Sequence, residues 1–202
     1  KWIEKFKELL INQKQERLFG NLVGRLLAYS PIGEDGYSPC EAVRMVIEEY
    51  YTDSLKTAYV VAEENKRGVH MVDSGKSELI LHQRYQKNAE ALQERYPYTA
   101  DIYFSISDNY KREAEYERRH AQIWPELKQL LSENGVYDYS IYWDKDTNIL
   151  YACQKIKGEA SSQEMGNTPI VQKWWDYMAD IMEVNPDNSP ISIPLIEVFH
   201  ME

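Results

Sequence analysis

The succession of strand-like and helix-like patterns in the second half of the chain limits its possible folds more than any other feature. Four short segments have the composition or alternation of β-strands: residues 100–107, 136–143, 148–158 and 191–200. Two helical patterns separate them. The first meets Pro125, where a helix either kinks or ends and restarts, and stops at Gly135. The second begins at Thr168-Pro169, a cap residue followed by a first-turn proline. Residues 100–107 also suit a continuation of the helix that follows them, so their state stays open.

With a first strand at 100–107, the order is strand, helix, strand, strand, helix, strand. This is the split βαβ, or ferredoxin-like, arrangement. We therefore expect an α+β protein with a C-terminal βαββαβ domain at residues 100–202. Its two helices cover one face of the sheet. The other face needs cover from a partner subunit's sheet or from the N-terminal helices.

Residues 1–99 have helical periodicity almost throughout, which predicts an all-helical N-terminal region. A serine cap followed by proline at Ser38-Pro39 predicts the start of its second helix. His70 and His82 are isolated in the sequence, and no group of residues has catalytic spacing. The interpretation is a helical bundle with solvated charges, and its role is unknown.

The charge and cysteine content of the chain exclude some classes of function. The formal net charge is −10, whereas nucleic-acid binding needs a basic surface. Cys40 and Cys153 have no CxxC spacing, so no zinc or redox motif is visible. No apolar run approaches the roughly 18 residues of a membrane span. We expect a cytoplasmic protein whose main partner is neither nucleic acid nor a membrane.

A histidine among aromatic side chains distinguishes residues 115–127, EYERRHAQIWPEL. At helical spacing, Tyr116, His120 and Trp124 lie on one face, and the charged residues, including Arg119, are expected in solvent. Two interpretations are open. The histidine moves protons on a bound polyhydroxylated molecule, or it is a buried residue satisfied by a polar neighbour.

Five motifs occur in the second half of the chain: EYERRHAQIWPEL, DYSIYWDKDTNILYA, VQKWWDYMADIM, NPDNSP and EVFH. In this order and at these separations they resemble the L-rhamnose mutarotase family over about residues 113–202. The resemblance implies interconversion of the α and β anomers of L-rhamnose, or a similar 6-deoxy hexose, by a dimer of ferredoxin-like subunits without metal or cofactor. The site residues that it implies are His120 as proton donor and Tyr116, Tyr139, Trp174 and Trp175 as substrate-binding residues.

Mutarotation needs proton transfers that these residue types can perform. One group takes the proton of the anomeric hydroxyl while another protonates the ring oxygen, and such catalysis contributes roughly 100- to 10,000-fold. Histidine serves either role near neutral pH, and the second carrier is Tyr116 or a water molecule. Adjacent helical residues point about 100° apart, so one of Trp174 and Trp175 is expected in the core and the other beside the sugar. Asp187 and Asn188 either bind sugar hydroxyls or hold a turn.

A non-enzymatic alternative stands beside the mutarotase. The chain would then be a hybrid of a helical interaction module and an incomplete mutarotase-like domain. Residues 1–99, which the resemblance does not cover, and the open state of residues 100–112 motivate it. A missing first strand would expose a sheet edge and disturb a dimer.

Overall fold

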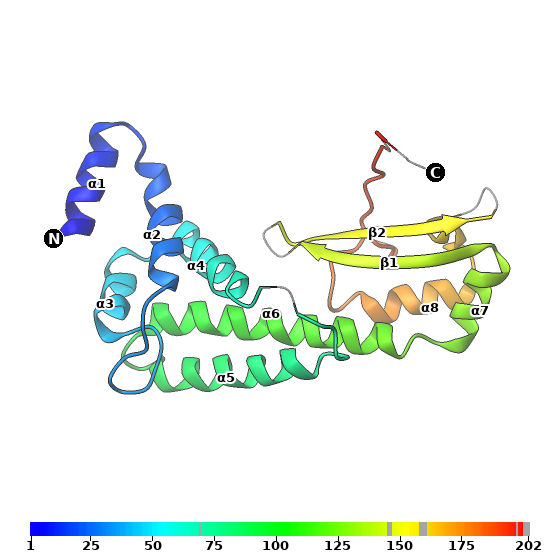
Figure 1. Cartoon of the computed structure of the whole chain (residues 1–202), viewed down its shortest axis with the longest axis horizontal. Coiled ribbons are helices and arrows are strands. Elements are labelled where there is room, and N and C mark those ends of the chain that lie inside the picture. Colours follow the sequence, from blue (N-terminus) through cyan, green and yellow to red (C-terminus); the bar gives the residue numbers. More distant parts are fainter. Residues whose placement is uncertain (69, 145–146, 158–160, 197, 200–202) are drawn as a thin grey trace. The chain divides into compact units, whose positions relative to one another are not determined.

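Helices form most of the chain in the computed structural model (Figure 1). The structure describes residues 1–202 except 69, 145–146, 158–160, 197 and 200–202. The elements follow in this order: α1 (Trp2–Asn12), η1 (Glu16–Leu18), α2 (Phe19–Ala28), α3 (Glu41–Tyr50), α4 (Asp53–Asn65), α5 (Lys76–Leu92), α6 (Pro97–Ala121), α7 (Pro125–Glu133), β1 (Val136–Asp144), β2 (Ile149–Ile156), η2 (Ser162–Met165) and α8 (Pro169–Met178). The helical character predicted for the N-terminal region is confirmed.

These elements divide into two compact units. Unit 1 comprises Lys1–Glu117 and the hairpin tip Trp143–Leu150, and unit 2 comprises Arg118–Tyr142 and Tyr151–Glu202. Most of α6 therefore belongs to unit 1, and its last residues belong to unit 2. Among the residues that the structure describes, no helix is both long enough and apolar enough to cross a membrane.

The segment left open between strand and helix, residues 100–107, lies inside α6. Ile102, Tyr103, Ile106 and Tyr110 are all buried, and their spacing places them on one face of a helix. Strand alternation would have put Tyr103 on the polar side, yet its exposed fraction is 0%. The helix therefore accounts for the burial of this segment better than a strand does.

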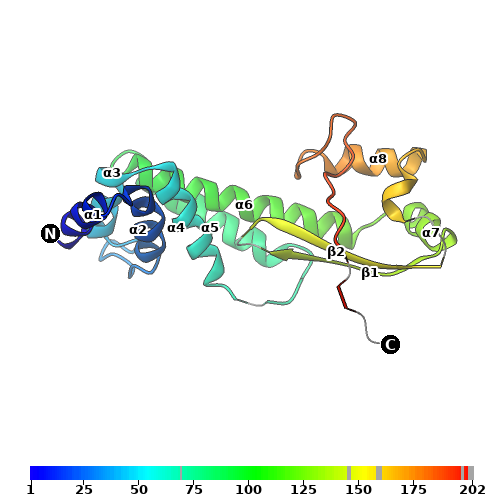
Figure 2. The ribbon, with the colours of Figure 1, turned by 90° about the horizontal axis from the view of Figure 1, so that it is seen from above.

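Tyrosine rings form the centre of unit 1, where α4, α5 and α6 meet. The Tyr103 ring meets the Tyr85 ring edge-on, with centroids 5.5 Å apart, and Tyr85 stacks on Tyr110 at 5.7 Å. Tyr59 completes the group, 6.3 Å from Tyr103. α5 runs alongside α6 in both Figure 1 and Figure 2. Aromatic pairs of this kind add about 0.5–1.5 kcal/mol each beyond area burial, so the phenol rings hold these three helices together.

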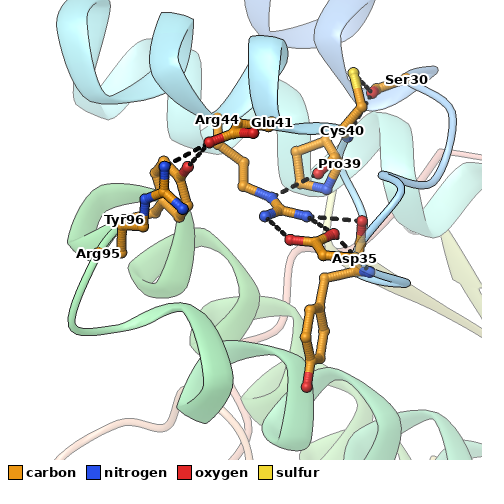
Figure 3. A network of polar contacts seen from close by, with 9 residues as sticks. Ser30, Asp35, Pro39, Cys40, Glu41, Arg44, Arg95 and Tyr96 are labelled. Carbon is orange, nitrogen blue, oxygen red and sulfur yellow. Dashed lines mark hydrogen bonds and ion pairs between the residues drawn. The ribbon is translucent and has the colours of Figure 1, made fainter.

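The start of α3 differs from the prediction. The helix begins at Glu41, and Ser38-Pro39 is a cis peptide bond in the preceding loop instead of a cap. Buried Arg44 holds this loop (Figure 3): its guanidinium donates to the Pro39 carbonyl at 2.7 Å and to the Asp35 carboxylate at 2.8 Å. The loop thus closes over an arginine of α3, an arrangement that the local cap signal does not reveal.

Unit 2 has a small apolar core between α7, η2 and α8, formed by Leu127, Val136, Met165 and Val171. β1 and β2 form a two-stranded sheet and correspond to the strand-like segments 136–143 and 148–158. α7 begins at Pro125, so the first helical pattern ends and restarts at the proline.

The ferredoxin-like arrangement is not seen in the described chain. The expected first strand, residues 100–107, is helical. The described residues of the expected last strand, 191–196 and 198–199, lie outside any strand, and the segment before them makes only the isolated bridge Val184–Pro190. Apolar side chains such as Ile193 and Val198 are exposed there. A strand is stable only when a neighbouring strand pairs with its backbone, and alternation alone does not supply that neighbour.

Candidate functional site

His120 lies in the last turn of α6, in unit 2. Its imidazole meets the indole of Trp174 from α8 edge-on, with ring centroids 5.6 Å apart and an interplanar angle of 86°. The break between α6 and α7 leaves room for this contact, because the chain turns away directly after Ala121. The predicted proton donor and one predicted substrate-binding residue are therefore neighbours.

Two more rings complete this group, which we call the ring cluster: His120, Trp124, Trp174 and Tyr177. Trp174 lies edge-on to Trp124 at 5.3 Å and 5.8 Å from Tyr177. Trp124 also contacts Tyr177 at 5.6 Å. α8 supplies two of the four rings at a spacing of three residues, which places them on one helical face. The cluster fixes the position of Trp174, against which the imidazole packs.

Arg119, expected in solvent, is instead a buried anchor of this site, with an exposed fraction of 8%. Its guanidinium donates to the Tyr177 carbonyl and to the Asp180 carboxylate, the latter at 3.0 Å through Nη2. The same guanidinium lies over the Tyr177 ring, 4.5 Å from its centroid. The hydrogen bond from Arg119 holds the pKa of Asp180 below its ordinary value. Arg119 thus fastens the end of α6 to the end of α8, beside His120.

Trp175 lines a separate cavity of about 490 Å³ in unit 2. Its ring packs against Gly166 so closely that a Cβ at that position would clash with it. The other lining residues are mostly polar: Glu164, Asn167, Gln172, Asn185, Asp187, Ser189, Pro190 and Ser192. A flat apolar ring beside several hydrogen-bonding groups suits a sugar, which has an apolar C–H face and a rim of hydroxyls.

The turn at residues 185–190 forms one wall of this cavity and is held by its own hydrogen bonds. Asp187 accepts from the Ser189 hydroxyl at 2.6 Å and from the Ser189 backbone N–H at 3.1 Å, and these bonds lower the pKa of Asp187. The Asp187 carbonyl accepts from Gln172 at 2.8 Å, and Asn188 donates to Asp176 at 2.9 Å. Asp187 and Asn188 therefore hold a turn and dock it on α8.

The predicted site residues fall into three places. His120 and Trp174 are in the ring cluster, and Trp175 is in the cavity, so the two adjacent tryptophans do have different surroundings. Tyr139 lies on β1 with 39% of its surface exposed and is not among the residues that line this cavity. Tyr116 is half-buried, one turn before His120 in the sequence of α6, and belongs to unit 1.

Sequence reasoning missed Arg119, Asp180 and Tyr177 as parts of this region. Helical periodicity placed Arg119 on a charged face, and no local pattern links it to Asp180, 61 residues later. The paired arginines of RRH directly before the histidine were the one visible signal, since two adjacent cations on a helix point in different directions.

Comparison with known proteins finds relatives of the second half of the chain. A family model described as L-rhamnose mutarotase matches residues 102–201. Two proteins named L-rhamnose mutarotase, from Phocaeicola vulgatus and Bacteroides thetaiotaomicron, are 81% and 80% identical to this chain over 90 residues. The matched residues make up 45% of this chain and 86% of each relative. The chain belongs to the L-rhamnose mutarotase family. The resemblance inferred from the five motifs is thus confirmed.

A solved member of the L-rhamnose mutarotase family shows the same partial coverage. The crystal structure of L-rhamnose mutarotase from Formosa agariphila is 62% identical, covers 43% of this chain and 83% of that chain, and has a TM-score of 0.40. The family model begins at residue 102. Residues 1–101 therefore lie outside the matched mutarotase region, although residues 102–117 of α6 belong to both the family match and unit 1.

Proposed function

We propose that residues 100–202 form an aldose mutarotase domain, which interconverts the α and β anomers of L-rhamnose or of a similar 6-deoxy hexose. The 81% identity to the Phocaeicola vulgatus L-rhamnose mutarotase, over 86% of that protein, carries this proposal. Residues 1–99 form a helical region whose role the proposal does not assign.

The reaction opens the hemiacetal and closes it on the other face of the carbonyl. A base removes the proton from the anomeric hydroxyl, the bond between the anomeric carbon and the ring oxygen breaks, and an acid protonates the ring oxygen. Rotation of the aldehyde and the reverse transfers give the other anomer. His120 is the proton donor in this scheme. Tyr116 or a water molecule is the second carrier.

The surroundings of His120 support this role. The imidazole packs nearly perpendicular to the Trp174 indole, and Arg119 of the same turn is fixed by Asp180. An imidazole whose orientation is set by its neighbours loses little freedom when it engages a substrate, which favours proton transfer. Arg119 is a positioning residue in this proposal, because it acts through the backbone next to His120.

Four tyrosine and tryptophan side chains are the proposed substrate-binding residues: Tyr116, Tyr139, Trp174 and Trp175. The polar cavity beside Trp175 supports this assignment best, since its indole is accessible next to several hydrogen-bonding side chains. The indole face would cover the C–H side of the pyranose and its methyl group, while the polar rim would receive the hydroxyls. No metal or cofactor is required by this chemistry.

The ferredoxin-like subunit, the homodimer and the cytoplasmic location implied by the family are parts of the same proposal. Exposed apolar side chains on the β1–β2 hairpin support the dimer, because such a surface is stabilised when another sheet covers it. These side chains are Tyr137, Tyr139, Tyr142, Ile149, Tyr151 and Ile156. Light scattering during gel filtration should give twice the chain mass, and a monomer at all concentrations would remove this part of the proposal.

Saturation-transfer NMR on L-rhamnose tests the activity. The full chain should exchange the anomeric proton signals well above the uncatalysed rate, and His120→Ala should reduce the catalysed rate by at least about 100-fold. Gln122→Ala, an exposed neighbour two residues later, is the matched control and should keep the rate. Equal rates for the wild type, His120→Ala and buffer alone would refute the enzyme.

The second candidate is the non-enzymatic hybrid, and the helical state of residues 100–107 favours it. In this case the chain uses its mutarotase-like half only as a folded module beside the helical region. A folded full chain that neither accelerates anomer exchange nor shows L-rhamnose-dependent chemical shifts would support this candidate over the enzyme.

A further inference from the structure

A second group of chemically active side chains lies in unit 1, apart from the ring cluster and the Trp175 cavity. Its members are His70, between α4 and α5; Glu78, in the first turn of α5; and Glu113 and Glu117, one turn apart on α6. One ligand atom from each of the four lies within 4.8 Å of the others. Segments far apart in sequence therefore bring one imidazole and three carboxylates to a single point.

The group is buried more deeply than a solvated charge cluster. Glu78 and Glu113 have exposed fractions of 0% and 5%, and Glu117 is half-buried. Burial and the nearby carboxylates of Glu78 and Glu113 raise the pKa of Glu117. Removing carboxylates from water is costly unless an opposite charge compensates them. The group therefore needs a cation.

Arg67 supplies part of that charge but does not complete it. Its Nη1 contacts Glu78 Oε1 and lies 3.9 Å from Glu113 Oε1. Among the contacts that the structure describes for Glu78 and Glu117, this guanidinium is the cation closest to the group, and it faces three carboxylates. Apart from this ion pair, the second carboxylate oxygen of Glu78, Oε2, is buried with no hydrogen-bond partner among the residues that the structure describes. Buried polar atoms without partners are rare in native proteins, and an ion is one of the few explanations for them.

We propose that His70, Glu78, Glu113 and Glu117 bind one divalent first-row transition-metal ion. The ion would offset negative charge of the buried carboxylates and give Glu78 Oε2 a partner. An imidazole with three carboxylates favours ions such as Zn²⁺ or Mn²⁺ over Mg²⁺, which prefers oxygen ligands and water alone. The site lies in unit 1, and its function is independent of the proposed mutarotase activity.

The distances between ligand atoms fit such an ion. His70 Nε2 lies 3.4 Å from Glu78 Oε1 and 3.8 Å from Glu113 Oε1. Two ligands that are each about 2.0–2.2 Å from one metal lie roughly 3–3.6 Å apart when they are adjacent in tetrahedral or octahedral geometry. The two distances from His70 are therefore close to those of adjacent ligands, and all four ligand atoms lie within 4.8 Å of one another.

Gly75 supports the fourth ligand. Its backbone N–H donates to Glu117 Oε2 at 2.9 Å, which orients this carboxylate in the way that outer hydrogen bonds orient metal ligands. The donation depends on a close approach between the Gly75 backbone and the backbone of Ala114. An ion at this point would tie the connection between α4 and α5 to α6.

Calorimetric titration of the metal-stripped full chain with ZnCl₂, MnCl₂ and MgCl₂ tests the site. We expect one equivalent of Zn²⁺ or Mn²⁺ to bind, at least ten-fold more tightly than Mg²⁺, and to raise the melting temperature by several degrees. Glu78→Gln and Glu117→Gln should each weaken this binding at least ten-fold. Glu8→Gln removes an exposed carboxylate from α1 and should leave it unchanged.

Bound Mn²⁺ should also show coupling to a single imidazole nitrogen in pulsed paramagnetic resonance, and His70→Gln should abolish it. The proposal is overturned if the wild type binds neither Zn²⁺ nor Mn²⁺, or if both glutamate variants bind them as tightly as the wild type. Binding of Mg²⁺ more tightly than Zn²⁺ would contradict the class of ion. If Glu78→Gln loses its helical circular dichroism, Glu117→Gln, which alters a half-buried residue, decides the question.

Discussion

Gly75→Ala should destabilise unit 1 by about 2–5 kcal/mol. Gly75 has φ +82°, a conformation that costs an L-residue roughly 1–2 kcal/mol. A Cβ there would also clash with the carbonyl oxygen and Cα of Ala114. These atoms belong to the backbone of α6 and cannot move aside by a change of rotamer, so overpacking adds about 1–3 kcal/mol.

Gly36→Ala is a matched control for this substitution. Gly36 has nearly the same φ, +81°, but no atom lies within 4 Å of an added Cβ. The backbone strain and the loss of freedom in the unfolded chain are therefore shared by the two variants. The difference between them, about 1–3 kcal/mol, reports the contact with Ala114 alone.

Urea unfolding followed by far-ultraviolet circular dichroism gives the measurement. Both variants and the wild type should be unfolded in EDTA, so that no bound ion contributes to stability. If Gly75→Ala loses no more stability than Gly36→Ala, Gly75 does not approach the α6 backbone closely. The hydrogen bond from the Gly75 N–H to the Glu117 carboxylate would then also be in error.

Three further substitutions test other parts of the structure. The hydrogen bond from Arg44 lowers the pKa of Asp35 from 3.8 to about 2, so its stabilisation is complete above pH about 4 and is lost as the pH falls towards 2. Urea midpoints across this range should therefore fall more steeply for the wild type than for Asp35→Asn, and equal slopes would contradict the ion pair. Ser105→Pro should cost about 3 kcal/mol or more if residues 100–107 are helical, and an unchanged urea midpoint would contradict the helix. Gly166→Ala should displace the Trp175 ring and weaken L-rhamnose binding several-fold in an NMR titration. Unchanged affinity would show that the cavity beside Trp175 does not bind the sugar.

Local sequence patterns predicted those elements that are specified by residues close together in the chain. The two neighbouring strands follow from their strand-like composition and alternation, and the interruption of the helix at Pro125 follows from proline's missing N–H. In each case the stabilising contact lies within a few residues, so the sequence window holds the necessary information.

Residues 100–107 show where such patterns fail. Ile102 and Ile106 occupy positions i and i+4 of a helix and also alternate positions of a strand, so the apolar residues alone cannot separate the two. Tyr103 decides the outcome, because its burial depends on Tyr59 and Tyr85. Those partners come from two other helices, and no local signal names them.

The sequence motifs name candidate site residues, whose roles stay predictions, but they do not give the arrangement of these residues. The motifs singled out His120 and the tryptophan pair, and the structure places Trp174 on the imidazole and Trp175 in the cavity. Arg119 was assigned to solvent because its partner Asp180 is distant in sequence. An ion pair between residues far apart in the chain produces no periodic sequence pattern, so sequence patterns do not predict it.

The tyrosine centre of unit 1 sets an alkaline limit on the protein. Burial raises the pKa of Tyr103 to about 12, and it also raises the pKa values of Tyr59, Tyr85 and Tyr110 well above the ordinary value. The unfolded chain releases these protons near pH 10, whereas the folded unit retains them, so stability is complete below that pH and declines above it. Phenylalanine rings would pack in the same space without this limit. Exposed tyrosines ionise without any opening of the fold, so the additional phenolate absorbance contributed by these four buried rings in base reports the opening of this unit.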